Sequence, residues 1–180
     1  MSDFKETRLS SEEIFQGRVV HLFRDRIRLP NGKESTREVI RHSGAVCVLP
    51  VTDEGEAVMV RQYRYPFSCI MLEAPAGKLD PGESPLAAAR RELSEETGVE
   101  AAEIIELGAF YPSVAYTDEV IHLYLARGLT FLQQHPDEDE FLDVARIPLK
   151  RLVADVLEGR IPDGKTQCII LKAAARLRAE

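Results

Sequence analysis

The chain has 180 residues, a length that suits one domain or one domain with a small appendage. Hydrophobic residues make up 44% of it and charged residues 29%, which is typical of a soluble globular protein with a sizeable core. The formal net charge of −7 argues against non-specific binding to nucleic acid, and no apolar run in the sequence reaches the length of a membrane span.

The first 42 residues predict a small antiparallel β unit. Residues 14–30 and 33–42 are strand-like runs, and Asn31-Gly32 between them is a strong hairpin signal. From Ser43 onward the strands become more apolar, which indicates burial on both faces. We therefore divide the chain into an N-terminal antiparallel β unit, residues 1–42, and a main domain, residues 43–180.

The main domain mixes strands with three helices. Strands are expected over residues 44–52, 56–64, 70–77, 104–113, 119–128 and 141–149. Helices are expected between Ser84-Pro85 and Gly98, over Leu149–Glu158, and over roughly Lys165–Arg178. Mixed strands around one central helix, followed by two more helices, predict an α/β sandwich.

The three cysteines indicate a reducing compartment. Their odd number, without CxxC or Cys/His spacing, argues against a disulfide framework and a zinc site. Cys47 and Cys168 lie in apolar runs and are expected in the core, whereas Cys69 is expected to be partly exposed. The N-terminal sequence also lacks the apolar core of a signal peptide. We therefore expect a cytoplasmic protein.

Acidic side chains are concentrated in the segment GKLDPGESPLAAARRELSEETGV, from Gly77 to Val99. Carboxylates at this density repel one another, so they lie on a solvated face or are neutralised by divalent cations. A solvated helix face is the commoner fate of such a charge run. The glycine-bearing turn Asp80-Pro81-Gly82 before the helix favours a fixed site instead.

The helix in this segment is expected to present two different faces. Ser84 is a good N-cap, Pro85 suits the first helical position, and Gly98 suits the position after the end. The spacing predicts a core stripe of Leu86, Ala89, Leu93 and Thr97 and a separate cluster of Glu92, Glu95 and Glu96. Such a cluster of carboxylates could supply oxygen ligands to Mg²⁺.

The same segment resembles the signature of the Nudix hydrolases. That signature is Gly, five residues, Glu, seven residues, Arg-Glu-aliphatic, one residue, Glu-Glu, one residue, Gly-aliphatic. Every fixed position is matched by Gly77, Glu83, Arg91-Glu92-Leu93, Glu95-Glu96 and Gly98-Val99. The resemblance implies an α/β/α sandwich with a mixed sheet.

Within that family the chain resembles the ADP-ribose pyrophosphatase branch. The resemblance rests on the small N-terminal sheet, VRQYRYP at residues 60–66, LEAPAGKLDPGE at 72–83 and YPSVAYTDE at 111–119. It implies a homodimer that exchanges N-terminal sheets. One departure is Ser113-Val114-Ala115, where the branch commonly has Ser-Pro-Gly, so the path of this loop and the substrate are left open.

The resemblance implies Mg²⁺-dependent hydrolysis of ADP-ribose to AMP and ribose 5-phosphate. Mn²⁺ also suits oxygen ligands. One alternative is hydrolysis of another nucleotide sugar, such as GDP-mannose. Another is a Nudix domain that only binds a nucleotide, although the intact Arg-Glu-Leu-Ser-Glu-Glu segment counts against it. No binding to nucleic acid or membranes is expected.

The metal ligands expected from the residues are Glu92 and Glu96, with Glu95 on the same face. The resemblance adds the backbone carbonyl of Ala76. Arg91 is expected to orient a glutamate and Glu83 to complete the cluster, although a structural salt bridge between these two is an equal alternative.

The general base is expected in the acidic loop HPDEDEF. The resemblance favours Glu138 and Glu140 over the neighbouring acids and does not separate the two. Without the resemblance, a solvated acidic loop is the simpler interpretation.

Substrate contacts are expected mainly from arginines. Arg61 and Arg64 follow an apolar strand, where a guanidinium can bind a phosphate through two hydrogen bonds, and surface solubility is the alternative. Arg41 is a weaker candidate, and Glu119 and Tyr63 are candidates for the sugar or the base.

Overall fold

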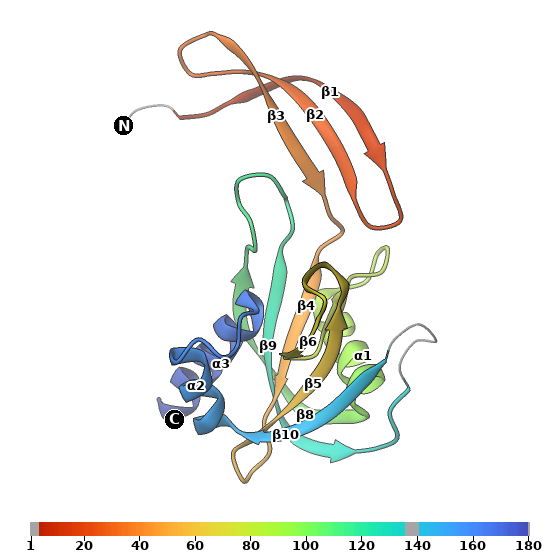
Figure 1. Cartoon of the computed structure of the whole chain (residues 1–180), viewed down its shortest axis with the longest axis vertical. Coiled ribbons are helices and arrows are strands. Elements are labelled where there is room, and N and C mark those ends of the chain that lie inside the picture. The colour runs from red at the N-terminus through yellow and green to blue at the C-terminus, as the bar shows by residue number, and fades with distance from the viewer. Residues whose placement is uncertain (1–3, 136–140, 180) are drawn as a thin grey trace. The chain divides into compact units, whose positions relative to one another are not determined.

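A computed structural model describes residues 4–135 and 141–179 of the chain. The chain divides into two compact units (Figure 1). The first unit contains the residues up to Ser43 together with Tyr111–Val120. The second unit contains Gly44–Phe110 and the chain from Ile121 onward. Each unit is built around its own sheets.

The first unit contains an antiparallel sheet of β1 (Thr7–Gln16), β2 (His21–Arg28) and β3 (Glu34–Arg41), in that order. Gly32, with φ 83°, forms the turn between β2 and β3, as the Asn-Gly signal predicted. The segment Tyr111–Val120 joins this unit through backbone hydrogen bonds. The Ile40 N–H donates to the Tyr116 carbonyl at 2.7 Å, and the Asp118 N–H donates to the Ile40 carbonyl at 3.2 Å.

Two sheets form the second unit. The first has the order β7-β4-β9-β8, with β4 and β9 parallel and the other pairs antiparallel. The second has the order β10-β5-β6 and is antiparallel. The strands are β4 (Ala45–Pro50), β5 (Glu56–Arg64), β6 (Cys69–Glu73), β7 (Ala76–Lys78), β8 (Val99–Phe110), β9 (Ile121–Phe131) and β10 (Leu142–Pro148). A short 3₁₀ helix, η1 (Tyr65–Phe67), connects β5 to β6.

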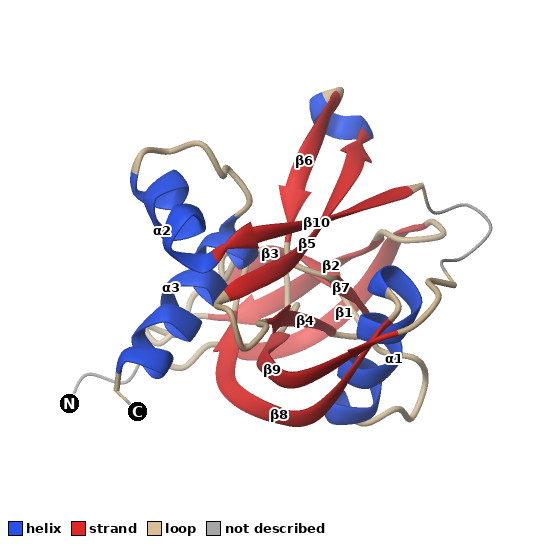
Figure 2. Cartoon of the chain, turned by 90° about the horizontal axis from the view of Figure 1, so that it is seen from below, coloured by secondary structure: helices blue, strands red, loops and turns tan. Residues whose placement is uncertain are grey.

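Helices cover the strands of the second unit on both sides. Figure 2 shows α1 (Pro85–Thr97) on one side and α2 (Leu149–Leu157) and α3 (Gly164–Arg178) on the other. The central strand β4 is buried along its whole length and serves both layers. Val46 and Val48 pack with α1, whereas Cys47 and Leu49 pack with α3, because successive side chains of a strand point to opposite faces. The predicted α/β sandwich is confirmed.

The ends of helix α1 follow the sequence signals. The Ser84 hydroxyl accepts a hydrogen bond from the Ala87 N–H at 3.3 Å, and Gly98 takes the left-handed conformation, with φ 65°. The prediction of its faces was partly wrong. Leu86 is 45% exposed, whereas Ala88 is fully buried. The small side chains of Ala88 and Ala89 allow the helix to pack closely there, so Leu86 is left outside the contact.

The three cysteines differ in burial. Cys47 is buried, Cys168 is half-buried and Cys69 is exposed. Within residues 4–135 and 141–179, no helix is both long and apolar enough to cross a membrane.

Candidate active site

Strand β7 and helix α1 bring two glutamates together in a buried position. Glu92 and Glu96 are one helical turn apart and only 8% and 3% exposed. The Ala76 N–H donates a hydrogen bond to Glu96 Oε2 at 3.0 Å. Gly77 lies directly against Glu92, since a Cβ on Gly77 would stand 2.0 Å from Oε1 of that glutamate. The absence of a side chain at Gly77 therefore makes the space for the Glu92 carboxylate.

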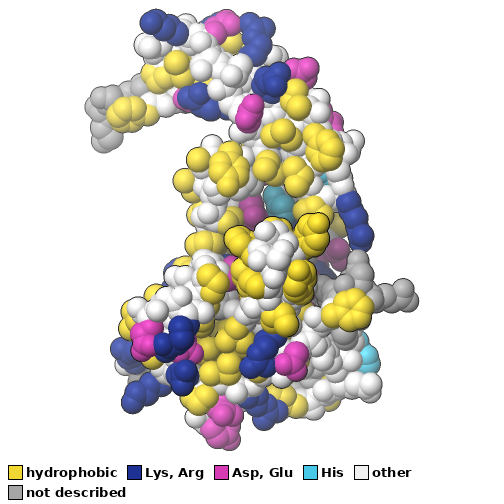
Figure 3. Space-filling view, in the orientation of Figure 1, with side chains coloured by type: hydrophobic (Ala, Val, Ile, Leu, Met, Phe, Trp, Pro, Cys, Tyr) yellow, Lys and Arg dark blue, Asp and Glu magenta, His cyan; other side chains and the backbone are white. Residues whose placement is uncertain are grey.

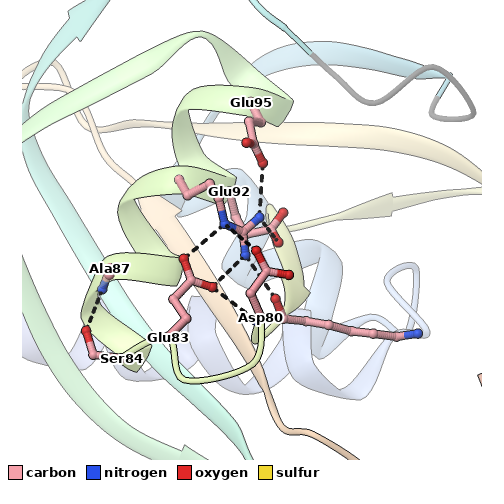
Figure 4. Close-up of polar contacts among 8 residues, drawn as sticks. Asp80, Glu83, Ser84, Ala87, Glu92 and Glu95 are labelled. Atoms are coloured by element: carbon pink, nitrogen blue, oxygen red, sulfur yellow. Dashed lines mark hydrogen bonds and ion pairs between the residues drawn. The ribbon is translucent and has the colours of Figure 1, made fainter.

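Arg91 donates hydrogen bonds to three neighbouring carboxylates, those of Glu83, Glu92 and Glu95, which Figure 4 labels. Its Nε and Nη2 donate to the two oxygens of Glu83 at 3.0 and 2.9 Å. Its Nη1 donates to Glu92 Oε1 at 2.8 Å and to Glu95 Oε2 at 3.0 Å, and its Nη2 also donates to the Lys78 carbonyl at 3.0 Å. Arg91 thus orients three glutamates and fixes the turn before the helix.

These ion pairs also shift the ionisation of the groups involved. The hydrogen bonds with Glu83 are the main reason why the pKa of Arg91 is raised, although burial acts against it. The pKa of Glu83 is lowered, first by the Arg91 side chain and then by the Asp80 N–H. Glu83 and Arg91 therefore stay charged at neutral pH.

The donors in this cluster fit a hard divalent cation such as Mg²⁺. One arginine charge faces the carboxylates of Glu83, Glu92 and Glu95, and Glu96 lies one turn further on, so negative charge is in excess. All of these donors are oxygens, which Mg²⁺ prefers. Among the described residues, no three acidic, histidine or cysteine side chains converge into a complete metal cage. A cation here would be held by few carboxylates and by water or substrate oxygens, as is usual for Mg²⁺.

Arg64 takes part in a charged network that the sequence did not predict. Its Nε and Nη2 donate to Glu73 Oε1 and Oε2 at 2.6 and 2.7 Å, and Lys165 donates to the same carboxylate. Burial acts to raise the pKa of Glu73, but Arg64 and Lys165 outweigh it and lower that pKa to about 2. Lys165 also donates to Asp163 Oδ2 at 2.9 Å. The Nη1 group of Arg64 takes no part in the pair with Glu73.

The other substrate-binding candidates lie in different places. Arg61 on β5 pairs with Asp143 on β10 at 2.8 Å and is half exposed, and Tyr63 is also exposed. Arg41 and Glu119 belong to the first unit. Arg41 donates to Ser11 Oγ at 3.0 Å and stacks over the ring of Phe23, and Glu119 lies 3.9 Å from His42 Nδ1.

The loop at Ser113-Val114-Ala115, where the related branch has Ser-Pro-Gly, forms its turn without a glycine. The Thr117 N–H donates to the Ser113 carbonyl at 3.2 Å, and Ala115 has no positive φ. Val114 at the tip is 82% exposed. The loop therefore presents an apolar side chain from the first unit.

The chain after β9 is held against the end of helix α1. The His135 N–H donates to the Glu95 carbonyl at 3.1 Å, and the Gln134 side chain donates to the Glu96 carbonyl at 2.7 Å. This segment leads to the acidic loop, whose candidate bases Glu138 and Glu140 lie outside the described residues.

The comparison with family models decides the family. The NUDIX domain model matches residues 41–166. The chain belongs to the Nudix hydrolases. A second model, the nucleoside diphosphate sugar hydrolase N-terminal domain, matches residues 6–40.

Curated relatives of this Nudix hydrolase match between 74 and 92% of its length. An ADP-ribose pyrophosphatase of Bacillus subtilis is 43% identical over 92% of this chain and 91% of the relative. A methanol dehydrogenase activator of Bacillus methanolicus is 46% identical over 91% of this chain and 89% of the relative. A GDP-mannose pyrophosphatase of Yersinia pestis is 35% identical over 74% and 72% of the two chains.

The fold also matches a solved structure described as an ADP compounds hydrolase. The TM-score is 0.86 over 99% of this chain and 98% of the other, at 24% sequence identity. At this identity the match supports the fold, which is again the predicted one.

Proposed function

We propose that this Nudix hydrolase cleaves the diphosphate bond of ADP-ribose to give AMP and ribose 5-phosphate, with Mg²⁺ as cofactor. The observation that carries the proposal is the pair of buried glutamates, Glu92 and Glu96, packed against the backbone of β7. The 43% identity to an ADP-ribose pyrophosphatase over 92% of the chain supports the choice of substrate.

The main difficulty of the reaction is that the negative charge of the diphosphate repels a nucleophile, and the proposed Mg²⁺ counters that charge. A bound Mg²⁺ neutralises phosphoryl oxygens and lowers the pKa of a bound water. Glu92 and Glu96 would hold it, with Glu95 and the Ala76 carbonyl as further ligands. Arg91 keeps Glu92 and Glu95 oriented through its hydrogen bonds to both. Glu83 in turn holds Arg91 through two hydrogen bonds, so its proposed role is to position the arginine.

The reaction also needs a base and groups that bind the substrate. In the proposal, Glu138 or Glu140 removes a proton from the attacking water, whose oxygen joins one phosphorus while the bridging oxygen leaves with the other. The Nη1 group of Arg64, which is not used in its pair with Glu73, is proposed to bind a phosphate oxygen. Arg61, Arg41, Tyr63 and Glu119 are proposed as further substrate contacts.

A coupled phosphate-release assay tests this function. Alkaline phosphatase releases phosphate from AMP and ribose 5-phosphate, because both are phosphate monoesters. It releases none from intact ADP-ribose, which has no terminal phosphate. We expect turnover with Mg²⁺ and its near-complete loss in Glu96→Gln, together with weaker binding of Mn²⁺ measured by spin resonance. Glu100→Gln is the control, because Glu100 is exposed on β8. Absence of turnover by the unaltered protein would overturn the proposal.

GDP-mannose is the second candidate substrate, supported by the relatives from Yersinia that are named for it. The same assay separates the two, because the initial rates with ADP-ribose and GDP-mannose can be compared at equal concentration. A kcat/KM at least tenfold higher with GDP-mannose would replace the first substrate by the second. The metal and base roles would stay unchanged.

A homodimer through the N-terminal sheets is part of the proposal. Every residue of β1 is exposed, so both faces of this strand lack cover within one chain. Apolar side chains are visible at the surface of both units (Figure 3). Ile14, Phe15 and Val20, in and beside β1, are 40, 57 and 41% exposed. A second copy would bury them.

Light scattering after gel filtration tests the dimer. We expect twice the chain mass for the unaltered protein and a shift toward the monomer for Phe15→Glu, which places a charge in the proposed interface. Leu157→Glu on α2 is the control, because Leu157 is 74% exposed in the second unit. A monomeric unaltered protein would contradict this part of the proposal.

A further inference from the structure

We propose that Lys165 is a positioning residue for the anionic substrate, acting through Glu73 to keep the charge of Arg64 available. This inference rests on the proposed function, in which Arg64 contacts a phosphate. Arg64, Glu73, Asp163 and Lys165 form a charged network at the start of helix α3, a helix that is far from the Nudix signature in the sequence.

The geometry of the network makes Glu73 a shared partner. Glu73 is 3% exposed and accepts hydrogen bonds from Arg64 at both carboxylate oxygens and from Lys165 at one of them, Oε2. Lys165 is 14% exposed at its side chain and also donates to Asp163, the N-cap of α3. These four groups carry two positive and two negative charges, so the network is neutral as a whole.

The charge of Lys165 is what leaves Arg64 free to attract an anion. A buried carboxylate without a second cation would be neutralised by Arg64 alone, and the local field at the Nη1 group of Arg64 would then be weaker. Burial acts to lower the pKa of Lys165, but Glu73 and Asp163 raise it above its ordinary value, so Lys165 stays charged. Removing it would leave the network with one net negative charge, which repels a diphosphate.

The same network is anchored to the strand segment that leads to the glutamate pair. Glu73 ends β6, and the next residue, Ala74, donates its N–H to Thr166 Oγ at 3.0 Å. Thr166 is fully buried and lies next to Lys165 at the start of α3. The position of Glu73 is thus fixed by its strand and by α3, and the replacement of Lys165 changes the charge more than the geometry.

Steady-state kinetics with ADP-ribose test the inference. We expect Lys165→Met to raise KM about tenfold while kcat stays within about twofold, because an ion contact to the substrate weakens without a change in the cleavage step. Lys165→Arg keeps the charge and is expected to restore KM to within about threefold. Lys172→Met is the matched control, since Lys172 lies on the same helix and donates to the Leu107 carbonyl.

A double variant distinguishes charge from mere packing. Glu73→Gln added to Lys165→Met removes the surplus negative charge, so KM is expected to move back toward that of the unaltered protein by about threefold or more. If Lys165 served stability alone, kcat would fall with the folded fraction while KM stayed constant in the single and the double variant. This result, or a KM of the double variant no lower than that of Lys165→Met, would overturn the inference.

The outcome can be separated from that of the proposed function. Turnover by the unaltered protein decides the proposed function, and the ratio of KM values between variants decides this inference. If the unaltered protein cleaves no diphosphate, calorimetric binding of inorganic pyrophosphate to the same variants replaces KM. A dissociation constant unchanged by Lys165→Met, or no binding by the unaltered protein, would then refute it.

Discussion

Replacing Gly77 by alanine tests whether the space beside Glu92 determines the candidate metal site. Gly77 has no positive φ, so its backbone accepts alanine without strain. The new Cβ would stand 2.0 Å from both the carboxyl carbon and Oε1 of Glu92. Ordinary contact begins at 3.4 Å, so the carboxylate must move by about 1.4 Å.

A displacement of this size is expected to lower both activity and stability. A misplacement of about 1 Å in a catalytic group can lower kcat/KM ~10²-fold, which corresponds to about 2.7 kcal/mol of transition-state stabilisation. The folded state should lose about 1–3 kcal/mol, as in other overpacked sites. Binding of Mn²⁺, measured by spin resonance, should weaken about 10- to 100-fold.

Two further variants make the Gly77→Ala experiment specific. Gly159→Ala is the control, because Gly159 has φ 74° and nothing within 4 Å of its Cβ position, so this change strains the end of α2 without touching Glu92. Glu92→Asp shortens the side chain, so adding Gly77→Ala to it should cost less than Gly77→Ala alone. Unchanged kcat/KM and Mn²⁺ affinity in Gly77→Ala, at full folding, would refute the reasoning.

Three further changes follow from the packing around the site. Thr166→Val removes the acceptor of the buried Ala74 N–H and is expected to cost about 1–3 kcal/mol in urea unfolding, whereas Thr166→Ser should cost less. Gly98→Ala should cost at least ~2 kcal/mol, because Gly98 has φ 65° and its Cβ would meet the Leu132 carbonyl at 2.6 Å, whereas Gly159→Ala meets nothing and should cost only about 1 kcal/mol. Because the pKa of Glu73 is lowered in the folded chain, its ionised carboxylate stabilises the fold at pH values above the ordinary pKa of 4.5. This stabilisation is lost as the pH falls toward about 2. Acid unfolding should therefore be less steep in Glu73→Gln over that range, and an equal slope would contradict the assignment.

The sequence was most informative where the chemistry lies on one continuous element. Glu92 and Glu96 are four residues apart, and a helix with clear start and stop signals places them on adjacent turns whatever the rest of the chain does. Which side of that helix is buried depends on its partners. The backbone of β7 covers the two glutamates, and no periodicity of the helix itself predicts that contact.

The features that the sequence did not predict depend on contacts between distant segments. Glu73 and Lys165 are separated by 92 positions, and each looks like an ordinary charged residue in its own surroundings. The only local signal was the acid at the end of the apolar run IMLE, a position that burial makes costly without a partner. The inclusion of Tyr111–Val120 in the first unit likewise depends on its pairing with Ile40, 71 positions away from the start of that segment.

Gly77 and Gly98, the two fixed glycines of the Nudix signature, are required for different physical reasons. Gly98 has a positive φ and is approached by the backbone of residues 132–134, so a side chain there would strain the helix end and displace the chain that leads to the acidic loop. Gly77 has no unusual backbone, and the carboxylate of Glu92 occupies the space of its missing side chain. A change at Gly98 should therefore act on stability, and a change at Gly77 on metal binding. The fixed spacing between the two follows from one helix that must place its glutamates against β7 at one glycine and end at the other.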